Sequence, residues 1–134
     1  MYLFDTNVLI EIVSRRPRAA LLRRFADLKT GQFNTSSIVI MELRQGTARD
    51  RDPVAAWDAI ESVLLHNLTV LDFTERIALA AADIDAALER RGRTLPEIDL
   101  MIGVTAVAHS LKLVTRNVKD FVDIPGLEVE NWMD

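Results

Sequence analysis

The chain begins with YLFDTNVLIEIV, residues 2–13, which predicts a β-strand that passes directly into an α-helix. The first three of these residues are apolar, and the run ends at Asp5. Thr6 and Asn7 are residue types that favour the first position of a helix, and an apolar segment, residues 8–13, follows them. Asp5 is therefore expected at the carboxyl end of the first strand, where open α/β sheets bind their ligands.

The same alternation of short apolar strands and helical patterns continues along the chain. Strands that alternate with helices pair in parallel, so the sequence predicts a three-layer α/β/α sandwich around a parallel sheet of four to five short strands. The predicted strands are 2–4, 33–37, 69–71 and 112–115, with 128–130 as a candidate fifth. Six helices are predicted. The first three are residues 8–13, a helix opened by Pro17 and stopped by Gly31, and residues 37–46, which Ser36 or Ser37 caps. The other three are residues 53–65, a helix from the Thr74 cap to Gly92, and a helix from a capping box at Thr94–Glu97 to about Ser110.

Length and composition predict a single globular domain, residues 1–134. The chain is 49% hydrophobic and 27% charged, which excludes a disordered or fibrous protein. No apolar run approaches the roughly 20 residues that a membrane span needs, and the N-terminus lacks the basic region of a signal peptide. The absence of cysteine excludes disulfides, thiolate catalysis and Cys-ligated zinc, so a cytoplasmic protein without a membrane partner is expected.

The charge balance argues against a protein that binds nucleic acid by bulk electrostatics, because the formal net charge is −4. Thirteen of the 16 basic residues are arginine, however, and they cluster along the chain. Arginine suits bidentate contacts to phosphate.

Two acidic residues are candidates for a site near the strand ends. Asp5 follows the first strand directly, and its alternative role is to cap the next helix. Glu42 lies inside the predicted helix 37–46, where Gly46 leaves space one turn further on; its alternative is a solvent-exposed side chain.

Asp99 is the third candidate and the most informative. At helical spacing it shares a stripe with Ile102, Gly103 and Ala106, a face that is expected to pack inward. An unpaired carboxylate buried there would cost several kcal/mol, of which the helix N-terminus offsets about 0.3–1 kcal/mol, and a bound cation would offset far more. A hydrogen-bond partner near the helix N-terminus is the alternative.

A fourth group of polar residues follows the strand at 112–115. Thr115 offers a hydroxyl, Asn117 a carbonyl oxygen and Asp120 a carboxylate, although Asp120 would equally suit a turn cap. Three converging carboxylates without histidine or cysteine make a hard-oxygen site, which selects Mg²⁺, or Mn²⁺ in its place, over zinc.

Competing chemistries lack their motifs. The sequence has no phosphate-binding P-loop, no dinucleotide fingerprint and no nucleophile elbow. His66 and His109, the only histidines, are expected to be structural.

These residues together resemble the PIN domain and, within it, the VapC-type toxins of bacterial toxin–antitoxin pairs. The resemblance covers essentially the whole chain in order. It rests on Phe4-Asp5-Thr6-Asn7, Ser36 to Gly46 with Met41-Glu42-Leu43-Arg44-Gln45-Gly46, Leu95-Pro96 with Asp99 and Met101-Ile102-Gly103, Leu113 to Asn117 with Asp120-Phe121, and Pro125 to Val129 with Trp132.

The resemblance implies a Mg²⁺-dependent endoribonuclease that is the toxin of a type II pair. It also implies that the protein forms a homodimer, is inhibited by a cognate VapB-type antitoxin, and assembles with that antitoxin into larger complexes. The metal-site acids of the family fall on Asp5, Glu42 and Asp99. Many members carry a fourth acid where this chain has Asn117, so either Asn117 serves through its amide oxygen or a bound water, or Asp120 substitutes, or one metal suffices. The remaining supporting positions are Thr6, Asn7 and Thr115, with Arg44 and Arg116 as weaker candidates for holding substrate phosphates.

The mechanism expected from this likeness is hydrolysis of RNA by metal-activated water. Asp5 and Asp99 would bind Mg²⁺, and Glu42 would orient or deprotonate the attacking water. For the antitoxin, residues 8–13 and 21–28 are expected to line a groove for a partner helix, and a basic antitoxin side chain would enter the acidic pocket. The alternatives are a structure-specific DNA nuclease, a Mg²⁺ phosphotransfer enzyme, and a catalytically inert PIN-fold binding module.

Overall fold

Five short parallel strands form the centre of the protein, in a computed structural model that describes residues 1–134. The spatial order is β3-β2-β1-β4-β5, so the first strand occupies the middle of the sheet. In register, Leu3 lies opposite Leu113 on one side and Asn34 on the other. The parallel sheet and its fifth strand confirm the prediction. The strands are β1 (Tyr2–Phe4), β2 (Phe33–Ser36), β3 (Thr69–Leu71), β4 (Lys112–Val114) and β5 (Val129–Glu130).

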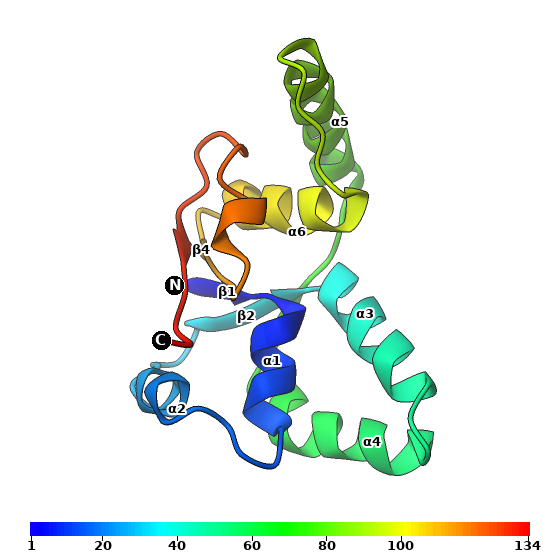
Figure 1. The fold of residues 1–134 in the computed structure, drawn as a ribbon, viewed down its shortest axis with the longest axis vertical. Coiled ribbons are helices and arrows are strands. Elements are labelled where there is room, and N and C mark those ends of the chain that lie inside the picture. The colour runs from blue at the N-terminus through cyan, green and yellow to red at the C-terminus, as the bar shows by residue number, and fades with distance from the viewer.

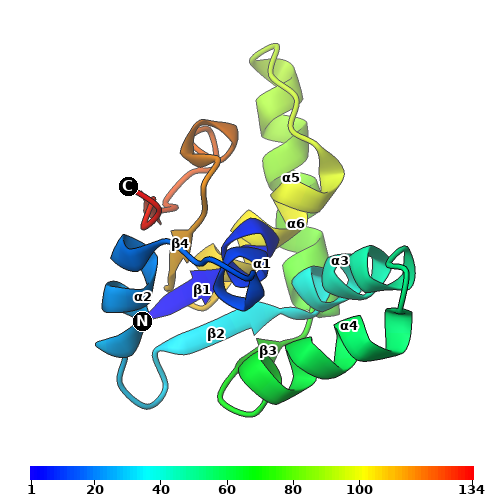
Figure 2. The same ribbon diagram turned by 60° about the horizontal axis from the view of Figure 1, so that its bottom comes forward.

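Helices cover the sheet, which confirms the predicted sandwich. Figures 1 and 2 show α6 on one side of the central strands and α1, α2 and α4 on the other, while α5 projects beyond the body of the molecule. The α-helices are α1 (Thr6–Val13), α2 (Ala19–Ala26), α3 (Ser37–Ala48), α4 (Pro53–Ile60), α5 (Glu75–Arg90) and α6 (Glu97–Ala108). A π-helical turn (Glu61–Leu65) extends α4, and a 3₁₀ turn (Val118–Asp120) follows β4. No helix is both long and apolar enough to span a membrane.

The order in which strands are added to the sheet changes sides between β1 and β4. Strands β2 and β3 extend the sheet to one side of β1, and β4 and β5 extend it to the other. The ends of β1 and β4 are held together by a 2.9 Å hydrogen bond from the Asp5 N–H to the carbonyl oxygen of Val114. Ligands of open α/β sheets bind at such a switch point, beyond the carboxyl ends of the strands.

The structure confirms some of the predicted helix starts and corrects others. Ser36 caps α3 and Thr74 caps α5 through their hydroxyl groups, as expected. Asp5 itself caps α1, the alternative role named for it above, and Thr6 and Asn7 do not, because the Asp5 carboxylate accepts from the first free helical N–H.

Two further predicted helix starts are wrong by a few residues. The second helix begins at Ala19 after an Arg18 cap, so Pro17 precedes the helix instead of opening it. The capping box at Thr94 does not form: α6 begins at Glu97, and Pro96 occupies the cap position without a side-chain hydrogen bond.

Aromatic rings anchor the core on the side of the sheet that faces the C-terminal residues. Phe4 contacts Phe25, Phe33 and Trp132 edge to face, with ring centroids 5.1–5.9 Å apart. Trp132 is only 2% exposed and its indole N–H donates to Glu130. The C-terminal residues therefore cover one face of β1 and belong to the core.

Candidate metal centre

The Asp5 carboxylate lies at the carboxyl end of β1, where it is 6% exposed and fully hydrogen-bonded. Its Oδ1 accepts from the Thr6 backbone N–H at 2.8 Å. Its Oδ2 accepts from the Thr115 hydroxyl at 2.7 Å and, more weakly, from the Asn7 amide at 3.4 Å. The predicted supporting residues Thr6, Asn7 and Thr115 therefore all contact Asp5, and they orient its two oxygens. Asp5 therefore both caps α1 and lies at the candidate site, so its role as a helix cap does not exclude its role as a site acid.

Glu42 is brought to Asp5 by a single side-chain contact between two helices. The Thr6 hydroxyl, at the start of α1, donates a 2.6 Å hydrogen bond to Oε1 of Glu42 on α3. Glu42 is half-buried. Because Thr6 follows Asp5 directly, this contact holds the two acids at one edge of the sheet.

Asp99 occupies the first turn of α6 and is half-buried. Its neighbours on the inward stripe, Ile102, Gly103 and Ala106, are buried as the sequence predicted. Its side chain accepts no hydrogen bond from the protein, so the predicted alternative of a hydrogen-bond partner is not realised. Burial raises the pKa of Asp99 to about 6, and the negative charges of Asp5, Asp120 and Glu42 add to this effect.

The acidic cluster, defined as Asp5, Glu42, Asp99 and Asp120, carries unbalanced negative charge. Burial raises the pKa of Asp5 above its usual value; hydrogen bonds from Thr115 and Thr6 lower it, and the charges of Glu42 and Asp120 raise it. None of the five ion pairs of the protein involves a member of the cluster. No protein cation therefore neutralises these carboxylates.

Of the two candidates for the fourth position, only Asp120 carries a charge that acts on Asp5 and Asp99. Asp120 is half-buried in the 3₁₀ turn after β4 and raises the pKa of both Asp5 and Asp99. Asn117 is exposed, and its side chain makes no hydrogen bond.

Gly103 helps to position the segment that carries Asp120. Ile124 packs against the Cα of Gly103 so closely that a Cβ there would overlap it, and Phe121 would lie 3.4 Å from such a Cβ. The missing side chain lets the segment after β4 approach α6, the helix of Asp99.

The two predicted phosphate-binding arginines lie outside the cluster. Arg116 pairs with Glu11 at 3.2 Å, and its backbone N–H donates to Asn7. The Arg44 guanidinium stacks on Trp57, with 4.9 Å from its central carbon to the ring centroid. His66 and His109 are both exposed, so neither is a core histidine.

The donor set of the cluster fits a hard divalent cation. Its members are carboxylates, the ligands that Mg²⁺ and Mn²⁺ prefer, and their mutual repulsion is relieved by a positive charge. As placed, no three acidic or histidine side chains are already drawn together at ligand spacing. Two of the carboxylates are instead held by the hydroxyls of Thr6 and Thr115.

The chain combines a parallel α/β sandwich with an acidic cluster at the switch point of its sheet, and proteins of known class share its sequence and fold. The PIN domain family profile matches residues 2–127. Ribonuclease VapC2 of Haemophilus influenzae is 33% identical over 132 residues, covering 98% of each chain. The tRNA(fMet)-specific endonuclease VapC of Salmonella typhimurium is 31% identical, covering 98% of this chain and 97% of that one.

Solved structures agree with the sequence comparisons. The DNA-bound VapBC complex from Salmonella typhimurium contains a chain with a TM-score of 0.87 and 33% identity, over 98% of this chain and 99% of that one. The chain therefore belongs to the PIN domain family and, within it, to the VapC ribonucleases of toxin–antitoxin systems.

Proposed function

We propose that this protein is the toxin of a type II toxin–antitoxin pair and a Mg²⁺-dependent endoribonuclease that hydrolyses RNA phosphodiester bonds. The observation that carries the proposal is the acidic cluster at the ends of β1 and β4, which no protein cation neutralises, in a chain of the VapC family. An RNA phosphate cannot approach such a cluster without a bridging cation, because both are negatively charged.

The proposed roles follow from the contacts of each carboxylate. Asp5 and Asp99 would hold the cation: Asp5 is oriented by its hydrogen bonds, and Asp99 has both oxygens free of protein donors. Asp120 would complete the site as the fourth acid. When bound, Mg²⁺ would supply Lewis-acid stabilisation of charge on the phosphate and lower the pKa of water.

Glu42 would orient the attacking water and accept its proton. The Thr6 hydroxyl fixes Oε1, which leaves Oε2 as the oxygen available to a water molecule. A carboxylate within hydrogen-bond reach of the attacking water can act as a general base. Thr6 is thus a positioning residue for Glu42.

End-group analysis of cleaved RNA tests the reaction. Attack by water leaves 5′-phosphate and 3′-hydroxyl ends, and cleavage should stop when EDTA removes the cation. Inducible expression of the wild-type chain and of Asp5→Ala, followed by sequencing of RNA 5′ ends, would locate the cut sites in cells. Products with 2′,3′-cyclic phosphate, or cleavage that persists in EDTA, would contradict the metal-dependent hydrolysis.

An apolar groove between α1, α3 and α4 is the proposed seat of an antitoxin helix. The groove has a volume of about 360 Å³ and is lined by Ile10, Val13, Leu43 and Ile60, with Gly46 leaving it open. Ile10 and Val13 of the apolar stretch 8–13 line this groove, whereas Phe25 and Leu28 of the stretch 21–28 line a separate pocket. Several structural relatives are toxin–antitoxin complexes, which supports a VapB-type partner there.

Co-expression tests this assignment. Ile10→Glu should release a co-purified antitoxin while leaving RNA cleavage intact, and Val122→Glu, another exposed apolar residue outside the groove, should not release it. Retention of the antitoxin by Ile10→Glu would move the interface elsewhere. Light scattering of the free chain would test the proposed homodimer.

A further inference from the structure

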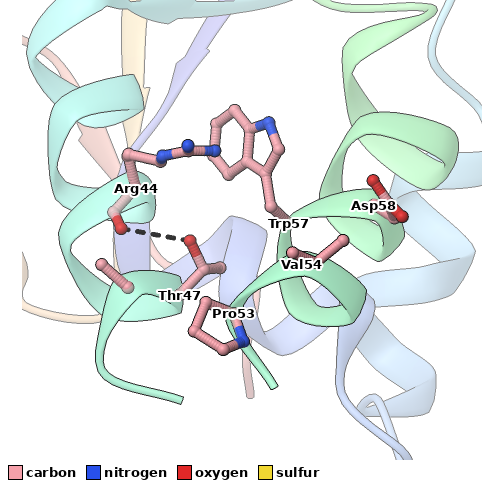
Figure 3. Close-up of a pocket in the computed structure, with 7 residues that line it drawn as sticks. Arg44, Thr47, Pro53, Val54, Trp57 and Asp58 are labelled. Carbon is pink, nitrogen blue, oxygen red and sulfur yellow. Dashed lines mark hydrogen bonds between the residues drawn. The ribbon is translucent and has the colours of Figure 1, made fainter. Parts of the chain in front are cut away.

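A second pocket lies between α3 and α4, away from the acidic cluster. Its volume is about 330 Å³, at the small end of the range for ligand pockets, roughly 300–1,000 Å³. Figure 3 shows the Arg44 side chain extending from α3 toward the indole of Trp57 on α4, with Pro53 and Val54 nearby. The lining residues include Arg44, Thr47, Pro53, Val54, Trp57 and Asp58.

Arg44 is held in place without its hydrogen-bonding groups being used. Its guanidinium lies 4.9 Å from the centroid of Trp57, yet it forms no ion pair and donates no hydrogen bond; only its backbone oxygen accepts, from the Thr47 hydroxyl at 3.1 Å. A guanidinium carries five N–H donors in a planar fork. Stacking thus restricts the Arg44 side chain while its donors stay available to a ligand.

The other stacked arginine of the protein shows what a purely structural pair looks like. Arg24 lies 4.3 Å from the centroid of Trp132, but it also pairs with Glu130 at 3.0 Å, and Trp132 is 2% exposed. The Arg24 guanidinium therefore already has an acidic partner, and its aromatic partner is buried in the core. At Arg44 and Trp57 the partner acid is missing and the ring is only half-buried.

We propose that the pocket at Arg44 and Trp57 receives one unstacked base of the RNA substrate, with guanine preferred. The inference rests on the proposed function and adds a specificity site to it. Unpaired bases are recognised by packing on aromatic rings and by hydrogen bonds to their edges. Guanine presents two adjacent acceptors, O6 and N7, which match the donor fork of arginine.

The pocket chemistry favours a base over a second phosphate. Val54, Pro53 and the Trp57 ring supply apolar surface, which suits a base and gives nothing to a phosphate group. Asp58 also lines the pocket and would repel phosphate, whereas the exocyclic amino group of guanine is a donor to a carboxylate.

The placement on α3 connects this pocket to the reaction. Glu42 and Arg44 are two residues apart, about 3 Å along the helix axis. Glu42 faces α1 through Thr6, whereas Arg44 faces α4 through Trp57. A nucleotide with its phosphate at the acidic cluster would have to turn a neighbouring base around α3 to reach the pocket, which only single-stranded RNA permits.

Binding can be measured without cleavage. In EDTA, 5′-GMP, 5′-AMP, 5′-CMP, 5′-UMP and ribose 5-phosphate are each titrated into the protein by isothermal titration calorimetry, which needs no tryptophan reporter and applies equally to variants of Trp57. We expect saturable binding of 5′-GMP, at least tenfold weaker binding of the pyrimidine nucleotides, and none of ribose 5-phosphate. Equal response to ribose 5-phosphate and 5′-GMP would show a phosphate site and overturn the proposal.

Three variants and one control link the pocket to specificity. Arg44→Ala and Trp57→Leu should weaken 5′-GMP binding at least tenfold, Trp57→Phe should restore much of it, and Arg49→Ala, an exposed arginine at the end of the same helix, should match wild type. Thermal unfolding of each variant checks that the fold persists. Unchanged 5′-GMP binding in folded Arg44→Ala and Trp57→Leu would also overturn the proposal.

Cleavage mapping separates this inference from the proposed function. On mixed single-stranded RNA, wild type should cut at a fixed offset from guanine, and Arg44→Ala should lose that preference. If wild type cleaves and the variants keep its pattern, the pocket assignment fails and the ribonuclease stands. If wild type never cleaves but binds 5′-GMP saturably, the ribonuclease fails and the pocket stands. If the variants lose antitoxin binding and keep the RNA pattern, the pocket belongs to the protein partner and the proposal is wrong.

Discussion

The hydroxyl of Thr115 donates a 2.7 Å hydrogen bond to Oδ2 of Asp5, 110 residues earlier in the chain. Thr115 is fully buried and also accepts from the backbone N–H of Asn117. One hydroxyl thus joins the end of β4 to the end of β1 and orients a carboxylate of the acidic cluster.

Thr115→Val should destabilise the protein and impair metal binding together. The substitution keeps the shape but leaves a buried carboxylate oxygen with only the weak contact from Asn7, so we expect a loss of about 1–3 kcal/mol in unfolding free energy. Denaturant titration and Mg²⁺ calorimetry would measure the two effects. Thr105→Val is the matched control, because the Thr105 hydroxyl bonds only within α6. A Thr115→Val protein with wild-type stability would refute this role.

Asp99→Asn should abolish cleavage and yet stabilise the metal-free protein. The substitution removes a half-buried charge that accepts no hydrogen bond and is repelled by three other carboxylates. Because solvent screens this side chain, we expect a gain of about 1 kcal/mol in unfolding free energy. Glu97→Gln, an exposed acid in the same helical turn, should change neither property. Undiminished cleavage or Mg²⁺ affinity in Asp99→Asn would remove Asp99 from the site.

The raised pKa of Asp99 predicts the direction of the pH dependence. Between 3.8, its unperturbed value, and about 6, the folded chain holds a proton at Asp99 that the unfolded chain releases. The contribution of Asp99 to stability therefore improves as pH falls from above 6 toward 3.8. The difference in melting temperature between Asp99→Asn and wild type should be largest above pH 6 and vanish near pH 3.8. A difference independent of pH would show that the Asp99 charge is not the cause.

Metal affinity should follow the opposite course with pH. Protons compete with the cation for carboxylate oxygens, so Mg²⁺ binding should weaken as pH is lowered through about 6, where Asp99 takes up its proton. Calorimetric titrations at several pH values would measure this. Absence of Mg²⁺ binding at every pH, with RNA left intact, would support an inert binding module in place of an enzyme.

Asp120→Asn and Asn117→Ala should differ in effect. Asp120 contributes charge to the cluster, whereas Asn117 is exposed and its side chain bonds nothing. We expect Asp120→Asn to reduce cleavage and Mg²⁺ affinity at least tenfold, and Asn117→Ala to reduce either less than twofold. The reverse order would assign the fourth position to Asn117.

The helix starts illustrate which local patterns were readable from the sequence. Ser36 and Thr74 cap their helices as predicted, because a hydroxyl at that position satisfies a nearby N–H whatever surrounds it. The capping box at Thr94 failed because Pro96 already occupies the cap position of α6. Asp5, and not Thr6, caps α1, and the Thr6 hydroxyl donates its hydrogen bond to Glu42.

The succession of strands and helices along the chain, the parallel sheet and the position of Asp5 at a strand end could be predicted from the sequence, because they follow from periodicity and chain connectivity. The tertiary structure was needed to show that the charge of Asp120 acts on Asp99 while the Asn117 side chain is exposed, and that Arg44 lies against Trp57. The reason is physical: which way a side chain points at a site depends on packing and hydrogen bonds between segments far apart in the chain, such as Ile124 against Gly103, and no local pattern records those contacts.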